Sequence, residues 1–160
     1  MAKNFEIKEK DKGWKEIKKE LKRLHKSYTK IGIQAGETRK DGKDLVVIAA
    51  THEFGTNKAG KNKNIRIPER SFLRTGIDNN KKKINNFIFE LIGKVEDGKI
   101  NAKTAVGDLG EFGEGLIKRR ITILKSPPLK GKTISKKGSS NPLVDTGQLR
   151  SSIRHKDFVK

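Results

Sequence analysis

The stretch His52-Glu53-Phe54-Gly55-Thr56 stands between an apolar run and a basic, glycine-containing loop. Its first two residues raise the question of a metal-hydrolase site, because zinc hydrolases carry His-Glu-x-x-His on a helix, with the glutamate as base. Here the fifth position is Thr56, and the other histidines, His25 and His155, fall in different predicted elements. We therefore expect no catalytic residue, no metal and no other cofactor, and we interpret the stretch as a structural corner.

The residues just before the corner predict a helix at 45–54. Asp44 can cap its start, Gly55 can end it, and its length favours a helix. A buried strand is the alternative, because periodicity does not separate the two.

Upstream of this helix, the sequence predicts a helix and a strand. Residues 14–28 form an amphipathic helix by their three- and four-residue apolar spacing, at Trp14, Ile17, Leu21, Leu24 and Tyr28. Residues 31–35 alternate between apolar and polar, as in a strand with one buried face.

Downstream, residues 57–66 carry four basic residues and no acid, and predict an exposed, mobile loop, before an edge strand at 65–68. Apolar stripes then predict helices at 77–95 and 102–124. Four glycines interrupt the second helix, at Gly107, Gly110, Gly113 and Gly115. Each costs about 1 kcal/mol relative to alanine, so a compensating interaction is expected, such as the close approach of another backbone.

The C-terminal quarter predicts an irregular arm and a short helix. Residues 125–143 contain three prolines and no acid, which is typical of a long basic arm. Asp145 and Gln148 resemble a helix cap, Leu149 and Ile153 would share a face of the last helix, and residues 155–160 add a strand or fray. The chain is thus predicted to be one α+β domain over 1–160, with a small, mostly antiparallel sheet packed with several helices.

Composition limits the function classes. The 38 Lys and Arg against 19 Asp and Glu give a net charge of +19, which attracts polyanions. Sequence-specific readout of nucleic acid is poorly supported, because most of the phenylalanines fall on expected core faces: Phe54, Phe72, Phe87, Phe89 and Phe112. The absence of cysteine excludes disulfides, and no apolar run approaches the ~18 residues that span a membrane.

Two stretches taken together resemble a known family. HEFGT at 52–56, a basic loop and IPERSFLR at 67–74 resemble the Glu-Phe-Gly-Thr and Ile-Pro-x-Arg-Pro-Phe segments of tail-completion and neck proteins of long-tailed bacteriophages, the virion morphogenesis family. PPLKGKTISKKGSSNPLVDTGQLRSSI at 127–153 is similar to that family's Pro-Pro-Leu, Thr-Ile and Lys-Gly-Ser run, which ends in Pro-Leu-x-Asp-Thr-Gly-x-Leu-x-x-Ser-Ile. Ser71 departs from the family's usual proline, and the family's C-terminal strand is expected to be short or missing here.

The resemblance implies a non-enzymatic virion protein at the joint between phage head and tail, made in the host cytoplasm. Copies of the chain would form a ring around the DNA channel, between the connector or head-closure protein and the tail-terminator protein. The motif residues at the corner are Glu53, Phe54, Gly55, Thr56, Pro68, Arg70 and Phe72. Those of the C-terminal motif are Pro142, Leu143, Asp145, Thr146, Gly147, Leu149, Ser152 and Ile153.

At the corner we expect Gly55 to take the left-handed conformation, Phe54 to lie beneath it, and Glu53 to pair with Arg70 or Arg74. Seven lysines are predicted to contact channel DNA or a partner protein: Lys58, Lys61, Lys63, Lys130, Lys132, Lys136 and Lys137. Solvated loops or an acidic neighbour are alternatives for them. The rival function is a small basic protein that binds nucleic acid non-specifically, with a steep salt dependence.

Overall fold

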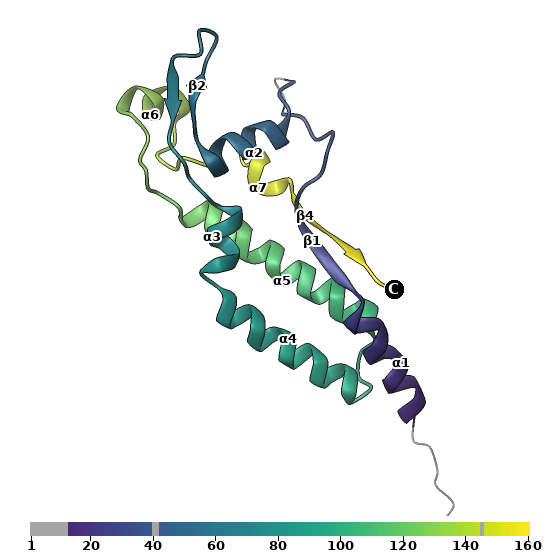
Figure 1. Ribbon diagram of the computed structural model, residues 1–160. Helices are drawn as coiled ribbons and strands as arrows, with labels where there is room; N and C mark the ends of the chain where they lie inside the picture. Colours follow the sequence, from purple (N-terminus) through teal and green to yellow (C-terminus); the bar gives the residue numbers. More distant parts are fainter. Residues whose placement is uncertain (1–12, 40–41, 145) are drawn as a thin grey trace, which may run out of the picture.

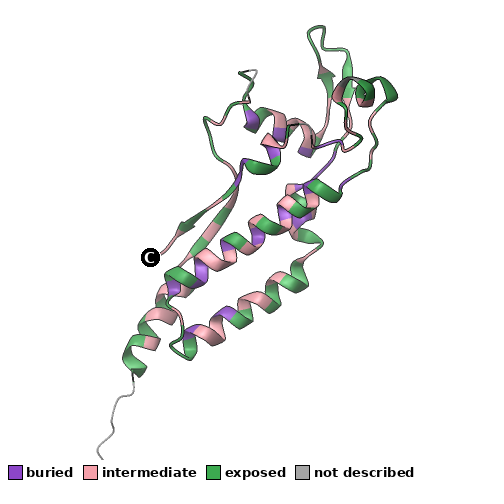
Figure 2. Ribbon diagram, turned by 180° about the vertical axis from the view of Figure 1, so that it is seen from behind, coloured by how far each residue is buried: buried purple, intermediate pink, exposed green. Residues whose placement is uncertain are grey.

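The longest helix, α5 (Ala102–Ile123), is the element against which most of the others pack (Figure 1). The computed structural model describes residues 13–39, 42–144 and 146–160, which form an α+β fold of seven helices and two two-stranded antiparallel sheets. The Asn101 side chain caps α5 by accepting a hydrogen bond from the Thr104 amide at 2.9 Å. Figure 2 shows the buried residues spread along α5.

At one end of α5, two helices bury their apolar faces. α1 (Trp14–His25) and α4 (Lys81–Glu96) pack against α5 and form a cluster around Leu91, Val95 and Ala105. Leu21 and Leu24 of α1 cover this cluster, as the amphipathic pattern of α1 requires. Glu20 joins the helices by accepting a hydrogen bond from the Ala102 amide at 2.8 Å.

The first sheet explains two of the glycines of α5. β1 (Tyr28–Ile33) pairs antiparallel with β4 (Ile153–Phe158), and the pair lies along α5. A Cβ at Gly110 would lie 2.5 Å from the His155 ring and 2.8 Å from the Thr29 hydroxyl, and one at Gly113 would lie 2.3 Å from Ile31. The compensating interaction is therefore the close approach of strand side chains, whereas the approach of another backbone was the possibility named from the sequence.

At the other end of α5, a second cluster joins distant parts of the chain. α2 (Leu45–Phe54), α3 (Leu73–Asp78) and α7 (Gln148–Ser151) meet there. The cluster contains Ala49, Phe72, Ile117, Ile121, Leu124, Leu143, Leu149 and Ile153. Asp44 caps α2 by accepting a hydrogen bond from the Val46 amide at 2.7 Å, which confirms the predicted helix at 45–54.

Beyond this cluster, two basic segments project from the same end of the molecule. β2 (Thr56–Ala59) and β3 (Ile65–Ile67) form an antiparallel hairpin, and α6 (Gly131–Lys137) lies beside it (Figure 1). The prediction of a mobile loop at 57–66 is wrong at residues 57–59, which belong to β2, whereas the predicted edge strand at 65–68 is confirmed as β3. The prediction of an irregular arm at 125–143 is wrong at α6, and Leu143 at its end is buried.

Two predicted helices have different bounds. Tyr28 does not continue α1 but begins β1, because it pairs with Phe158 of β4. The predicted helix at 77–95 is two helices, which separate at Asn79 and Asn80. The Asn80 side chain donates to the Gly76 carbonyl at 2.8 Å, which satisfies a carbonyl at the end of α3.

The C-terminus also differs from expectation. Ile153 does not share a helical face with Leu149 but opens β4, which pairs with β1 over all six of its residues. The C-terminal strand, which was expected to be short or missing, is therefore present as β4 with six residues. The N-cap of α7 is Gly147, with a φ of 79° and no side-chain cap, and the predicted capping residue Asp145 lies outside the described residues.

Candidate functional site

The carboxylate of Glu53 is the centre of the corner that the sequence singled out. Glu53 is 4% exposed and accepts four hydrogen bonds. The donors are the hydroxyl of Ser71 at 2.6 Å and the amides of Phe72 at 2.7 Å, Leu73 at 2.9 Å and Arg74 at 3.0 Å. The three amides lie at the start of α3, where backbone donors have no partner within the helix.

These contacts correct the predicted ion pair. From Arg74, Glu53 accepts a hydrogen bond only from the backbone amide, and the Arg74 guanidinium pairs with Glu69 instead. The Arg70 side chain forms no hydrogen bond or ion pair with Glu53 either, and donates to the carbonyls of Pro127 and Pro128. The amides prevail because a helix start offers several aligned donors to one carboxylate without ordering a long side chain.

The four hydrogen bonds also determine the charge of Glu53. Burial by itself would raise the pKa of this carboxyl group. The hydrogen bonds from Ser71 and from the amides of Leu73, Arg74 and Phe72 outweigh that effect, so the pKa of Glu53 lies below its ordinary value. Glu53 is therefore ionised at neutral pH, with its oxygens occupied by structural donors.

Ser71 is a contributor that the motif comparison did not identify. At this position, where the resembled family has proline, the hydroxyl makes the shortest of the four hydrogen bonds to Glu53. Proline has no hydroxyl to donate. The departure from the family pattern thus adds a donor to the corner.

Gly55 allows the chain to turn back along itself. Its φ is 70° and its ψ is 172°, so the positive φ is as expected but the extended ψ is not that of the left-handed helix. A Cβ would lie 2.7 Å from the Glu69 amide nitrogen and 3.0 Å from the Ile67 carbonyl oxygen. The turn is closed by a hydrogen bond from the Arg70 amide to the His52 carbonyl at 2.7 Å.

Arg70 connects the corner to the start of the predicted arm. Its side chain is buried, and it donates to the carbonyls of Pro127 at 2.7 Å and Pro128 at 3.2 Å. Segments 52–74 and 127–128, far apart in the sequence, are thus held together. Phe54, which was expected beneath the corner, is 69% exposed, and that prediction is wrong because Phe72 fills the interior at 0% exposure.

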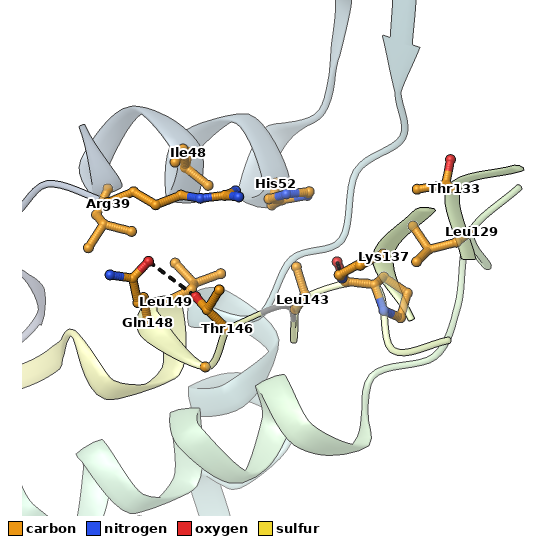
Figure 3. Close-up of a pocket in the computed structure, with 13 residues that line it drawn as sticks. Arg39, Ile48, His52, Leu129, Thr133, Lys137, Leu143, Thr146, Gln148 and Leu149 are labelled. Carbon is orange, nitrogen blue, oxygen red and sulfur yellow. Dashed lines mark hydrogen bonds between the residues drawn. The ribbon is translucent and has the colours of Figure 1, made fainter. Parts of the chain in front are cut away.

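Most of the C-terminal motif lies in the core beside this corner. Pro142, Leu143, Leu149, Ser152 and Ile153 are buried. The Ser152 hydroxyl donates to the Leu149 carbonyl at 2.9 Å. Thr146 is exposed and bonds to the Gln148 side chain at 3.1 Å (Figure 3). The five buried residues and the half-buried Pro68 and Thr56 are therefore used in packing.

A cavity of about 210 Å³ lies between α2, the segment around α6 and the C-terminal motif (Figure 3). Ile48 and His52 line it from α2, and Leu129, Leu143 and Leu149 line it from the other elements. The Nδ1 atom of His52 is buried without a hydrogen-bond partner among the described residues. Burial, together with the positive charges of Arg70 and Lys137, lowers the pKa of His52 to about 4, and burial has the largest effect.

We expect the free energy of unfolding to fall by about 2 kcal/mol between pH 7 and pH 5 through His52. The unfolded chain, with a histidine pKa of 6.5, binds more protons than the folded chain over this range. The contribution is complete above pH 6.5 and is lost as the pH falls toward about 4. Urea unfolding of the wild type and of His52→Gln at both pH values measures it.

The variant should lose most of this pH dependence. The lowered pKa of Glu53 does not interfere, because its contribution is lost only below the ordinary carboxyl pKa of 4.5. Parallel pH dependence in the two proteins would contradict the assignment to His52.

Five of the seven predicted contact lysines are exposed at the projecting end of the molecule. Lys58, Lys61 and Lys63 are exposed on the hairpin, and Lys130 and Lys132 are exposed at the start of α6. Lys137 instead donates to the carbonyls of Asn141 at 2.7 Å and Pro142 at 3.2 Å, so its ammonium group is used within the chain. The side chain of Lys136 lies outside the described residues.

Within the described ranges, no group of three or more His, Asp or Glu side chains lies close enough to hold a metal ion. Among the helices described, none is both long enough and apolar enough to cross a bilayer. Comparison with protein-family models, with curated protein sequences and with solved structures finds no match to this chain.

Proposed function

We propose that this chain is a structural, non-enzymatic component of a phage head-to-tail joint. It would assemble as a ring around the DNA channel and join the connector or head-closure protein to the tail-terminator protein. One observation carries the proposal. The two motif stretches at 52–74 and 127–153, which suggest the family by their order in the sequence, pack as one unit through Glu53, Arg70 and the cluster around Phe72.

The chemistry of the corner supports a structural role over an enzymatic one. All four hydrogen bonds to the Glu53 carboxylate come from within the chain, so its oxygens are not free to act as a base. The neighbouring His52 faces an apolar cavity and is neutral at pH 7. The two residues that resemble a hydrolase motif therefore serve folding.

The projecting end of the molecule offers a surface for a neighbouring subunit. Its hairpin and α6 carry five exposed lysines, Ile65 is exposed on the hairpin, and Phe54 is exposed at the end of α2 that leads into the hairpin. Apolar side chains inside a basic surface are typical of protein contacts with a charged rim. This end therefore suits contact with a neighbour in a ring.

The experiment is deletion of the gene from the phage that carries it, followed by electron microscopy of the particles. We expect filled heads apart from tails, or joined particles that fail to deliver DNA, and restoration by the wild-type gene supplied in trans. Supplying the gene with Glu69→Gln, a substitution at an exposed position of the same corner, should restore particles as well as the wild-type gene does. Normal, infectious particles without the gene would refute the proposal.

The second candidate is a small basic protein that binds nucleic acid non-specifically. The observation that favours it is the net charge of +19. It predicts normal particles in the deletion and tight binding to free duplex, so the same deletion separates the two functions.

A further inference from the structure

One side of α1 is a row of lysines. Lys15, Lys18, Lys19, Lys22 and Lys26 fall within an arc of about 100° at 3.6 residues per turn, and all five are exposed. Together with Arg23 and Lys160 they line a shallow, open hollow. The opposite side of the helix is apolar and packs on α4 and α5.

The outer face of the β1–β4 sheet adds further basic residues. Side chains alternate along a strand, and the register pairs Tyr28 with Phe158, Lys30 with Lys156, and Gly32 with Arg154 on that face. Residues Thr29, Ile31 and His155 point the other way, toward α5. The outer face of this sheet therefore carries aromatic and basic side chains and no acid over these six positions.

Two lysines of the sheet, Lys30 and Lys156, lie over the aromatic pair Tyr28 and Phe158. The rings of Tyr28 and Phe158 stack with centroids 4.9 Å apart. The Nζ atoms of Lys30 and Lys156 lie 5.3 Å and 5.7 Å from the Phe158 centroid. Cations over aromatic faces are attracted by the ring quadrupole, so the two ammonium groups are held over the Phe158 ring on the outer face of the sheet.

We name the basic face as the set of nine exposed side chains Lys15, Lys18, Lys19, Lys22, Lys26, Lys30, Arg154, Lys156 and Lys160. Among the residues that the structure describes, Lys15, Lys22 and Lys26 have no acidic partner. The pair of Lys19 with Glu16, at 3.5 Å, is solvent-exposed and neutralises little. The basic face thus has a large charge without internal compensation.

We propose that the basic face binds the phosphate backbone of double-stranded DNA without reading its sequence. A row of like charges suits a polyphosphate, whose contacts release counterions. A lipid surface fits less well, because Leu21 and Leu24 on the apolar side of α1 already pack against the cluster around Leu91 and are not free to enter a bilayer. Single strands fit less well too, because Tyr28 and Phe158 stack on each other instead of offering a free ring to a base.

This inference rests on the proposed function only in identifying the DNA as packaged genome. It leaves the hairpin and α6 for protein contacts. Binding in solution tests it independently of particle assembly, so failure of the inference and failure of the proposed function are distinguishable.

The test measures binding of the full chain to a random-sequence DNA duplex over a range of salt concentrations. The variant neutralises five members of the basic face: Lys15→Gln, Lys22→Gln, Lys26→Gln, Lys30→Gln and Lys156→Gln. The control removes the same charge from the other end of the molecule: Lys58→Gln, Lys61→Gln, Lys63→Gln, Lys130→Gln and Lys132→Gln. Unchanged thermal unfolding shows that both remain folded.

For the basic-face variant we expect the slope of log affinity against log salt to decrease in magnitude by about 4 to 5, at about 0.9 per phosphate contact. Its affinity at 0.1 M salt should fall by about 100-fold or more. The control should keep the wild-type slope. Equal losses in both variants, a loss confined to the control, or no duplex binding by the wild type would overturn the inference.

Anionic phospholipid vesicles and, separately, poly-glutamate serve as two further probes. We expect neither to compete with the duplex at equal concentrations of negative charge. Preferential binding to either probe would identify a lipid surface or an acidic protein as the partner and would also overturn the inference.

Discussion

Replacing Glu53 with alanine is expected to lower the free energy of unfolding by about 3–5 kcal/mol. The change removes an ionised, buried acceptor and leaves the Ser71 hydroxyl and the three amides at the start of α3 without their partner. A hydrogen bond to a charged group contributes about 1.5–3 kcal/mol, and losses within one network are smaller than their sum. Urea unfolding at pH 7 measures the difference.

The matched control is Glu69→Ala, which removes a carboxylate from the same corner. The ion pair of Glu69 with Arg74 is about half exposed on both sides, so we expect less than about 1 kcal/mol. Equal effects of the two substitutions would show that the buried network contributes no more than a surface charge.

Replacing Gly55 with alanine is expected to cost about 3 kcal/mol or more. Its combination of φ 70° and ψ 172° is adopted almost only by glycine. In addition, the new Cβ would collide with backbone atoms of Glu69 and Ile67, which cannot rotate away as the end of a side chain can. Thermal and urea unfolding of the variant measure the loss.

Gly138→Ala separates the two causes. Gly138 ends α6 with a φ of 70° and a ψ of 11°, and nothing lies within 4 Å of an added Cβ. Its substitution therefore costs only the left-handed conformation, about 1–2 kcal/mol. If Gly55→Ala costs no more than this control, the contact with Glu69 and Ile67 does not constrain the corner.

Local signals in the sequence predicted α2 correctly, because its limits depend on neighbouring residues. Asp44 accepts a hydrogen bond from an amide two residues away, and Gly55 ends the helix by its own backbone conformation. The partners of Glu53 were not predictable in the same way. Opposite charge indicated Arg70 or Arg74, whereas the actual donors depend on where α3 begins in space.

The errors in helix bounds have a related cause. The apolar spacing of 77–95 runs through the break at Asn79 and Asn80 because α3 and α4 both pack against α5. Tyr28 fits the spacing of α1, but pairing with Phe158, far along the chain, places it in a strand. Periodicity detects a buried side of the chain and does not register distant pairing.

The candidate site was predictable in part. The motif residues around Glu53 and Leu149 do come together, which the sequence indicated only through resemblance. Ser71 and the contacts from Arg70 to Pro127 and Pro128 were missed, since a hydroxyl and two carbonyls carry no distinctive signal in the sequence. The basic face was missed because its lysines come from both ends of the chain.

The close contact of α5 with the first sheet also constrains how this chain can change over evolutionary time. Gly110 has no room for a methyl group beside Thr29 and His155. A larger residue at this position therefore requires the side chains at both 29 and 155 to become smaller or to rotate away in the same lineage. The three positions should vary together in size among descendants of this sequence, whereas Gly115, with open space around it, should vary independently.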